Sequence, residues 1–177
     1  MPKFKNLPSQ QYLQACLTYD PETGKLHWRT RPREQFPNSR VWQMWNTRFA
    51  GRVVGSIRWG YLCICLDSIR FQVHRVIWKW MTSEEPSGDI DHADGDRANN
   101  RWVNLRVATK NQNQANSKCR NKVSLKGVYM PTLSKRFASQ ITVAGRHTYL
   151  GTFDTVEEAH AAYCQAAQKA WGEFWHP

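Results

Sequence analysis

The chain has 177 residues, of which 41% are hydrophobic and 12% aromatic, enough to bury a core in one domain or in two small ones. Its 25 Lys and Arg against 14 Asp and Glu give a formal net charge of +11, which favours a polyanionic partner such as nucleic acid. No apolar run reaches the roughly 18 to 20 residues of a membrane span, and residues 1–10 lack the apolar core of a signal peptide. We therefore expect an intracellular protein that is not secreted and has no membrane partner.

The first part of the chain predicts a scaffold of short helices and strands. Helical periodicity covers residues 8–18, a turn follows at 20–24, and strand patterns occupy 25–29, 53–54, 61–66 and 69–73. Asp67-Ser68 is placed for a hairpin turn, and residues 74–82 have helical character. Residues 30–50 are rich in arginine with little periodicity, so they form either a DNA-contacting loop or a polar insertion.

The five cysteines are odd in number, scattered, and contain no C-x₂-C pair. Neither a structural zinc site nor a redox motif is expected from this spacing. Cys63 and Cys65 are two apart in a predicted strand, so they should share one face and pack in a core.

The charge is unevenly distributed along the chain. No Asp or Glu occurs from Arg97 through Phe153, a stretch that carries eleven Lys and Arg. Such a segment is either a soluble basic face or a surface that follows the phosphates of a nucleic acid.

The most informative motif is Asp91-His92, Asn104 and Asn113, spaced as D-H-x₁₁-N-x₈-N. Phosphodiester hydrolysis needs a base that accepts a proton from water near neutral pH, and a histidine with a pKa of about 6.5 can do so. We expect His92 to be that base. Neighbouring strand residues point to opposite faces, so bringing Asp91 and His92 into one site implies an irregularity at the strand end.

A divalent cation is the economical stabiliser of the negative charge that develops on the phosphate and the leaving oxygen. Asp91 can supply a carboxylate oxygen and Asn113 an amide oxygen, leaving the other positions to water and phosphate. This hard, oxygen-rich set predicts Mg²⁺ (or Mn²⁺) rather than zinc.

These residues, within the sequence DHADGDRANNRWVNLRVAT, resemble the HNH endonuclease family and its ββα-metal module. The resemblance covers residues 74–117 and implies an N-terminal HNH nuclease domain with extra strands, over residues 1–117. It also implies that Asn104, the middle residue of the motif, holds the loop through hydrogen bonds to the backbone. His74 and Arg75, before the motif, are candidate phosphate contacts, with helix packing or capping as the alternative.

Residues 118–124 are predicted to be a linker, and residues 125–177 a second domain with a three-stranded antiparallel sheet and one helix. Residues 137–143 alternate in polarity, Ala144-Gly145 forms a turn, and Thr155 to Glu158 is a capping box that opens the helix. The stretch YLGTFDTVEEAHAAY resembles the AP2 domain, which implies that the sheet reads duplex DNA in the major groove.

The AP2 resemblance, carried over by position, implies two groups of contacts. The candidate base contacts are Lys126, Tyr129, Gln140, Thr142, His147 and Tyr149, and the candidate phosphate contacts are Lys135, Arg136 and Arg146. Packing within the domain is the alternative role for Tyr129 and Tyr149.

The sequence as a whole predicts an α+β protein: an HNH domain followed by an AP2-like domain. The function predicted is a site-specific, metal-dependent DNA endonuclease similar to phage homing endonucleases, acting on double-stranded DNA as a monomer. The alternatives are a DNA-binding regulator that keeps the HNH fold only as a scaffold, and a binder of structured RNA.

Overall fold

The computed structural model describes residues 6–117, 125–132 and 134–175, and these divide into two compact units. The first unit comprises residues up to His92 together with Asp96–Val107, and the second comprises Ala93–Gly95 and the residues from Ala108 onward. The predicted linker, residues 118–124, lies outside the described residues. Each unit is a mixture of helices and small sheets, which is compatible with the predicted α+β class.

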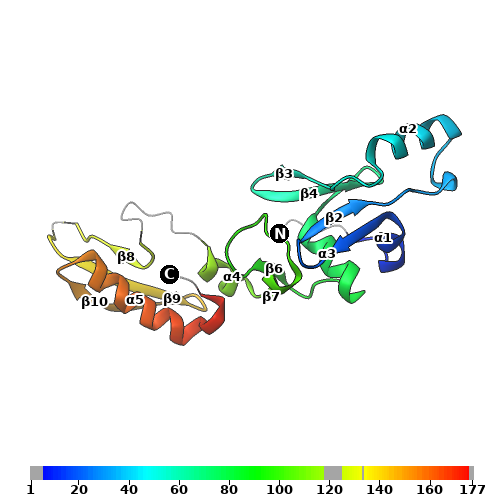
Figure 1. The fold of residues 1–177 in the computed structure, drawn as a ribbon. Coiled ribbons are helices and arrows are strands. Elements are labelled where there is room, and N and C mark those ends of the chain that lie inside the picture. The colour runs from blue at the N-terminus through cyan, green and yellow to red at the C-terminus, as the bar shows by residue number, and fades with distance from the viewer. Residues whose placement is uncertain (1–5, 118–124, 133, 176–177) are drawn as a thin grey trace. The chain divides into compact units, whose positions relative to one another are not determined.

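The first unit begins with a helix and a hairpin and ends with a two-stranded sheet (Figure 1). In chain order its elements are α1 (Gln10–Cys16), β1 (Leu17–Asp20), β2 (Lys25–Trp28), the 3₁₀ turn η1 (Arg33–Gln35), α2 (Ser39–Phe49), β3 (Ser56–Arg58), β4 (Tyr61–Leu66), β5 (Ile69–Gln72), α3 (Val73–Thr82), β6 (Asp89–His92), η2 (Trp102–Asn104) and β7 (Leu105–Ala108). The sheets are β1–β2, β3–β4–β5 and β6–β7.

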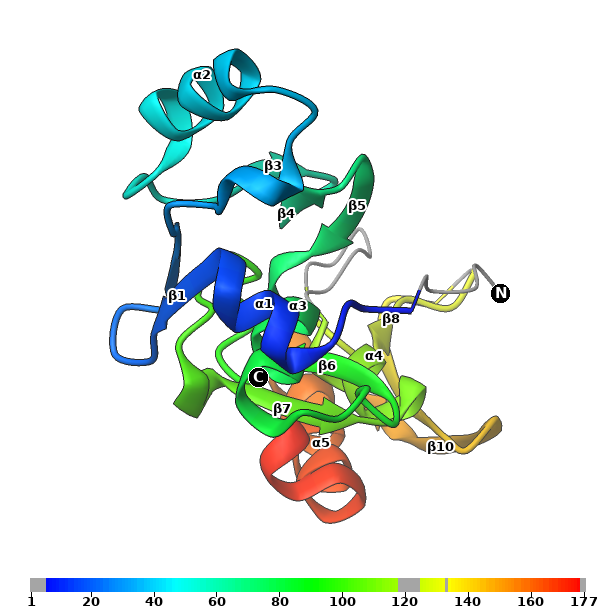
Figure 2. The same ribbon diagram turned by 90° about the vertical axis from the view of Figure 1, so that its right-hand side faces the viewer.

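The core of the first unit is apolar and continuous. It contains residues from α1, the β1–β2 hairpin, the β3–β5 sheet, α3 and the β6–β7 sheet, among them Leu13, Leu26, Leu66, Ile77 and Leu105. Helices α1 and α3 pack against each other, as Figure 2 shows from the side. Because Val73, Val76 and Ile77 are each 0% exposed, α3 presents its apolar face inward as its sequence spacing predicts.

The β4–β5 hairpin closes at Asp67-Ser68 as predicted, since Leu66 pairs with Ile69 and both turn residues have positive φ. Two other predictions for this region are wrong. Residues 53–54 contribute one isolated bridge, His27 to Val53, and not a strand. Cys65 is exposed while Cys63 is buried, because only one part of this strand face lies against the core.

Residues 30–50 are not an irregular loop. They contain η1 and helix α2, which begins after the Asn38 cap, where the Asn38 side chain accepts a hydrogen bond from the Val41 amide. On this helix Trp45 packs edge to face on Trp28, with ring centroids 5.1 Å apart. The tryptophans that gave no clear sequence period are therefore packing residues.

The second unit contains α4 (Lys110–Asn116), β8 (Val128–Tyr129), β9 (Phe137–Val143), β10 (Arg146–Phe153), α5 (Val156–Trp171) and the 3₁₀ turn η3 (Gly172–Phe174). Its antiparallel sheet has the order β10–β9–β8, and α5 packs on it. A capping box at Thr155 opens α5, and Ile141, Tyr163, Ala167 and Trp175 form its small core. The predicted sheet and helix are therefore present.

Helix α4 contacts α5 and η3, so it groups with the second unit. The domain boundary predicted at residues 117 and 125 stays a prediction. None of the helices in the described part of the chain is long and apolar enough to cross a lipid bilayer.

Candidate nuclease site

The predicted base and the predicted carboxylate ligand both lie at the end of β6, inside the first unit. Asp91 is 4% exposed and His92 is 3% exposed, so both side chains are enclosed by protein. A charged or titratable group is rarely buried so deeply unless it is paired, and the partners of each define what it can do.

The partner of His92 is an asparagine that follows it by eight residues. His92 Nε2 lies 3.2 Å from Asn100 Oδ1, and Asn100 Nδ2 donates to the Ala98 carbonyl at 3.2 Å. The Ala98 carbonyl can only accept, so it fixes the amide with its oxygen toward the histidine. In a neutral His92 ring this places the hydrogen on Nε2 and the lone pair on Nδ1.

Two rings pack against His92 on its other sides. His74 on α3 meets it edge to face with centroids 5.1 Å apart, and the Tyr61 ring on β4 lies 6.3 Å from it. Burial lowers the pKa of His74 to about 3, helped by the nearby His92 and Arg75 charges. His74 is therefore a neutral packing partner at neutral pH.

The Asp91 carboxylate is held by an arginine on the neighbouring strand. Arg106 Nε donates to Asp91 Oδ2 at 2.9 Å, and the Arg106 Nη2 atom lies 2.9 Å from the same oxygen. The pair is largely enclosed, with side-chain exposures of 19% for Arg106 and 4% for Asp91. This contact fixes the carboxylate in place and offsets part of its negative charge.

The loop between β6 and β7 is stabilised by a hydrogen bond within the loop and by contacts from the β1–β2 hairpin. Asn104 Nδ2 donates to the Asn99 carbonyl at 2.8 Å, a backbone contact of the kind that the HNH resemblance implies for this residue. From the β1–β2 hairpin, Tyr19 Oη donates to the Asn100 carbonyl at 2.8 Å. A Cβ on Gly24 would lie 2.5 Å from the backbone of Asn100 and Arg101, so this turn touches the loop directly.

Asn113, the predicted amide ligand, lies on α4 in the second unit and is partly exposed. The backbone N–H of Asn113 donates a helical hydrogen bond to the Thr109 carbonyl at 2.9 Å. A capping box of Thr109 and Gln112 fixes the start of this helix. Asn113 is thus described within the second unit, and Asp91, His92 and Asn104 within the first.

The predicted DNA-reading residues of the second unit share one face of its sheet. Gln140 pairs with Tyr149 and Thr142 pairs with His147 across β9 and β10, and all four are exposed. Tyr129 on β8 is 38% exposed and pairs with Ala138, on the same side as Gln140. The opposite face, which includes Ile141, packs on α5.

Other predicted DNA contacts are engaged within the protein. Arg75 is 8% exposed and its guanidinium meets Glu85 and the Gly88 carbonyl, which places it in the interior of the first unit. Lys126 is partly buried and donates to the Ala115 carbonyl on α4 at 2.9 Å. These positions fit packing roles better than contact with DNA.

The three predicted phosphate contacts of the second unit lie on its surface. Arg136 pairs with Asp154 at 2.7 Å, with both side chains more than half exposed. Lys135 and Arg146 are exposed, as contact with a phosphate backbone requires.

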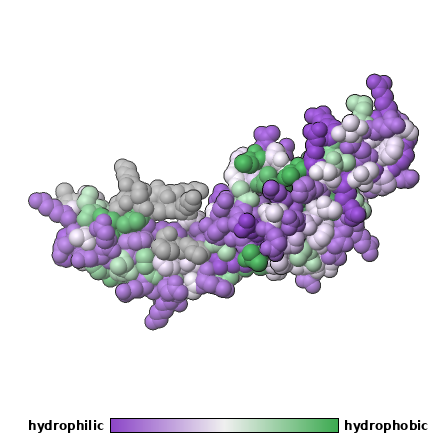
Figure 3. Space-filling model, in the orientation of Figure 1, coloured by the Kyte–Doolittle hydropathy of each residue, from purple (hydrophilic) through white to green (hydrophobic). Residues whose placement is uncertain are grey.

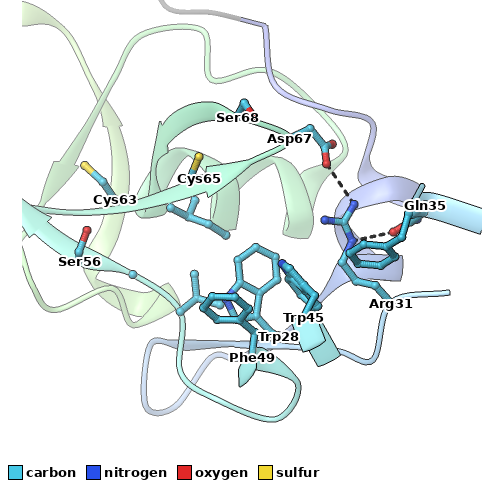
Figure 4. Close-up of a pocket in the computed structure, with 14 residues that line it drawn as sticks. Trp28, Arg31, Gln35, Trp45, Phe49, Ser56, Cys63, Cys65, Asp67 and Ser68 are labelled. Carbon is cyan, nitrogen blue, oxygen red and sulfur yellow. Dashed lines mark hydrogen bonds and ion pairs between the residues drawn. The ribbon is translucent and has the colours of Figure 1, made fainter. Parts of the chain in front are cut away.

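A separate cavity of about 540 Å³ lies between α2 and the β3–β5 sheet. In Figure 4, Trp28, Trp45 and Phe49 form one side, with the β4–β5 turn across from them. Arg31 closes one end, where it bonds Gln35 at 2.6 Å and Asp67 at 3.1 Å. Its guanidinium also lies 5.3 Å from the Trp45 ring centroid.

Sequence reasoning missed Asn100 and Arg106. Asn100 was hidden in an Asn-Asn pair that is ordinary turn chemistry, and Arg106 follows a strand pattern without any charge signal of its own. A buried carboxylate requires a compensating cation, and Arg106 is the one basic residue of the adjoining strand β7. Nothing in the spacing pointed to His74 as a ring partner of His92.

The chain matches one family model, described as HNH endonuclease, over residues 71–115. The matched stretch runs through α3, β6, η2, β7 and nearly all of α4, so it contains Asp91, His92, Asn104 and Asn113. It lies in the middle of the chain, whereas the sequence resemblance placed the nuclease domain at the N-terminal end. Neither the curated proteins nor the solved structures gave a match.

Proposed function

We propose that this protein is a site-specific, divalent-metal-dependent DNA endonuclease, with His92 as general base and the exposed sheet of the second unit as a reader of duplex DNA. The observation that carries the proposal is the His92–Asn100 hydrogen bond inside a stretch that matches HNH endonucleases. That bond places the hydrogen of a neutral His92 ring on Nε2 and its basic lone pair on Nδ1, as a general base requires.

The chemistry of the first unit follows from that arrangement. Nδ1 of His92 takes a proton from the attacking water, and the Asn100 oxygen stabilises the imidazolium that results through its bond to Nε2. His74 keeps the ring in place from the side and adds no positive charge, because burial keeps it neutral. The new hydroxide then displaces the 3′ oxygen of the phosphodiester.

HNH nucleases generally use a divalent metal, and the residues here fit a hard cation. Asp91 and Asn113 would hold it, one through a carboxylate oxygen and the other through an amide oxygen. When bound, such an ion supplies charge neutralisation to the phosphate and the leaving oxygen. In the described part of the chain no three His, Cys, Asp or Glu side chains cluster as a metal cage would require.

In this proposal the second unit recognises the DNA sequence. The face formed by Tyr129, Gln140, Thr142, His147 and Tyr149 is exposed and carries donors, acceptors and aromatic surface, while Lys135, Arg136 and Arg146 supply positive charge. A two-stranded ribbon fits the major groove, where each base pair has its own donor and acceptor pattern. This division resembles that of phage homing endonucleases, with one unit cutting and the other reading.

One observation favours the alternative of a non-cleaving DNA-binding regulator. Arg106 already occupies one oxygen of Asp91, and His92 is only 3% exposed, so the site is closed in this structure. Cleavage requires water and phosphate to reach His92. The two functions therefore differ in one measurable property, which is hydrolysis.

The experiment is incubation of the protein with supercoiled plasmid and phage genomic DNA, with Mg²⁺ or with EDTA. We expect metal-dependent cuts at discrete sites, lost in His92→Ala while DNA affinity is retained. His27→Ala is the matched control, because His27 is a partly buried histidine on β2 in the same unit. Tight, salt-sensitive binding without cleavage would establish the regulator instead.

The reader is tested separately by Tyr149→Ala, compared with Thr148→Ala on the same strand. Thr148 pairs with Ile141 and so belongs to the side that packs on α5. Tyr149→Ala should lower the ratio of affinity for the mapped cleavage site over random DNA, and Thr148→Ala should leave it unchanged. An unchanged ratio in Tyr149→Ala would remove this residue from the reading face.

A further inference from the structure

We propose that the turn between β3 and β4 is a DNA wedge, in which the Trp59 indole stacks on a base next to the phosphate attacked by the water that His92 deprotonates. The inference rests on the proposed nuclease function and adds to it the means by which the duplex is opened at the cleaved step.

Trp59 is poorly suited to the turn that it occupies. Arg58 pairs with Tyr61, so Trp59 and Gly60 form a two-residue hairpin loop, with φ of +50° and +80°. Such loops favour Asn, Asp or Gly at the first position, because a bulky side chain at positive φ is strained. The backbone therefore gives no reason for a tryptophan here.

Solvation gives no reason for it either. The Trp59 side chain is 82% exposed, and Ile57 on β3 is 69% exposed. Figure 3 shows hydrophobic patches over β3 and β4 on an otherwise largely polar face. A strained and exposed tryptophan at a hairpin tip is most simply explained by something that covers it when the protein acts.

The turn is attached to the catalytic site. Tyr61 follows Trp59 by two residues, and its ring lies 5.4 Å from His74 and 6.3 Å from His92. The Arg97 guanidinium, from the loop after β6, lies over the Tyr61 ring at 4.6 Å. A Cβ on Gly60 would lie 3.5 Å from Arg97 Nη1, so this arginine also reaches the turn itself. The backbone of this turn is therefore linked, through Tyr61 and Arg97, to the side chains that surround His92.

The charge around the turn selects a nucleic acid as the partner. From Gln35 through Leu66 the sequence has no Asp or Glu, and exposed Arg58 precedes Trp59 directly. Cations that bind phosphates, together with one protruding apolar side chain, are the features of proteins that unstack a base step. Aromatic stacking on the exposed base repays part of the cost of opening it.

The binding test compares matched short duplexes with the same duplexes carrying one mismatched pair, in EDTA. Because the mismatch is already partly unstacked, wild type should bind the mismatched duplex about tenfold more tightly, and Trp59→Ala should lose this preference. Trp59→Phe should keep it, since a phenyl ring also stacks. Met44→Ala is the control. Met44 on α2 is 63% exposed, so this variant removes another largely exposed apolar side chain.

The cleavage test uses the mapped site, with and without a mismatch at the cut step. Trp59→Ala should cut the matched site slowly and regain the wild-type rate on the mismatched one. Trp59→Gly is a second variant that also removes the indole. Because glycine adopts positive φ without strain, this variant should have a higher melting temperature than the wild type.

The wedge proposal would be wrong if Trp59→Ala and the wild type had the same affinities and cleavage rates on both duplexes. It would also be wrong if the variant lost the same factor in rate on the matched and the mismatched duplex. Failure of the nuclease proposal is a different result: wild type itself would then cut neither substrate, while the mismatch preference in EDTA would still report on Trp59.

Discussion

Burial of His74 makes the stability of the first unit sensitive to acid. The side chain is 4% exposed, and burial lowers its pKa from an ordinary 6.5 to about 3, with smaller contributions in the same direction from His92 and Arg75. A histidine with a lowered pKa favours the folded state only while it is neutral. Its contribution is complete above pH 6.5 and is lost progressively as the pH falls toward 3.

The magnitude follows from these two pKa values. Between pH 7 and pH 5 the unfolded chain takes up most of a proton at this position and the folded chain takes up almost none, which costs about 2 kcal/mol. Urea unfolding followed by tryptophan fluorescence at both pH values, in EDTA, measures the loss. His74→Gln should lose about 2 kcal/mol less than wild type over this interval, and His27→Gln should behave as wild type. Equal losses in wild type and His74→Gln would refute the reasoning.

Three further predictions concern single contacts. Asn100→Ala should lower kcat about a hundredfold, because the His92 ring loses the hydrogen bond that orients it. Asn100→Asp keeps the acceptor oxygen and should lose less. Plasmid cleavage rates measure both variants, and equal rates for the two would contradict the proposed orientation. Arg106→Leu should destabilise the protein by about 3 kcal/mol in urea unfolding, because it leaves the Asp91 carboxylate buried without its cation, and a loss below about 1 kcal/mol would show that solvent replaces the pair. Gly127→Ala should destabilise the second unit by about 2 to 4 kcal/mol, because φ is +74° and the new methyl would lie 2.0 Å from the Tyr163 ring; an unchanged melting temperature would contradict this close packing.

Local sequence signals predicted those elements whose residues carry a strong local preference. The Asp67-Ser68 turn, α3 and the capped helix α5 all follow from patterns within a few residues, and each is present. Helix α2 was missed because it packs through Trp45 on Trp28, a contact that no short window of sequence contains. Cys65 was misplaced because alternation along a strand says which residues share a face and not how far the core extends under it.

The candidate site was predictable as a set of residue types but not as a set of contacts. The spacing of Asp91, His92 and Asn104 identified a possible nuclease motif, since each residue type has a role in the chemistry. It could not identify Asn100 as the residue that orients His92, because the choice depends on which amide of a turn faces the ring. The Asp91–Arg106 pair likewise depends on the alignment of two strands.

The contact between the Gly24 turn and the Asn100 backbone determines how far this protein can be shortened without losing the geometry around His92. The loop that contains Asn100 packs against a hairpin more than 70 residues earlier in the chain. Tyr19 donates a hydrogen bond to the Asn100 carbonyl, and Gly24 lets the hairpin turn approach the Asn100 backbone closely. Residues 71–115 alone contain the matched sequence but lack this support. A fragment meant to keep the geometry around His92 should therefore include the whole first unit together with α4, because the matched sequence is shorter than the part of the chain that holds its loop in place.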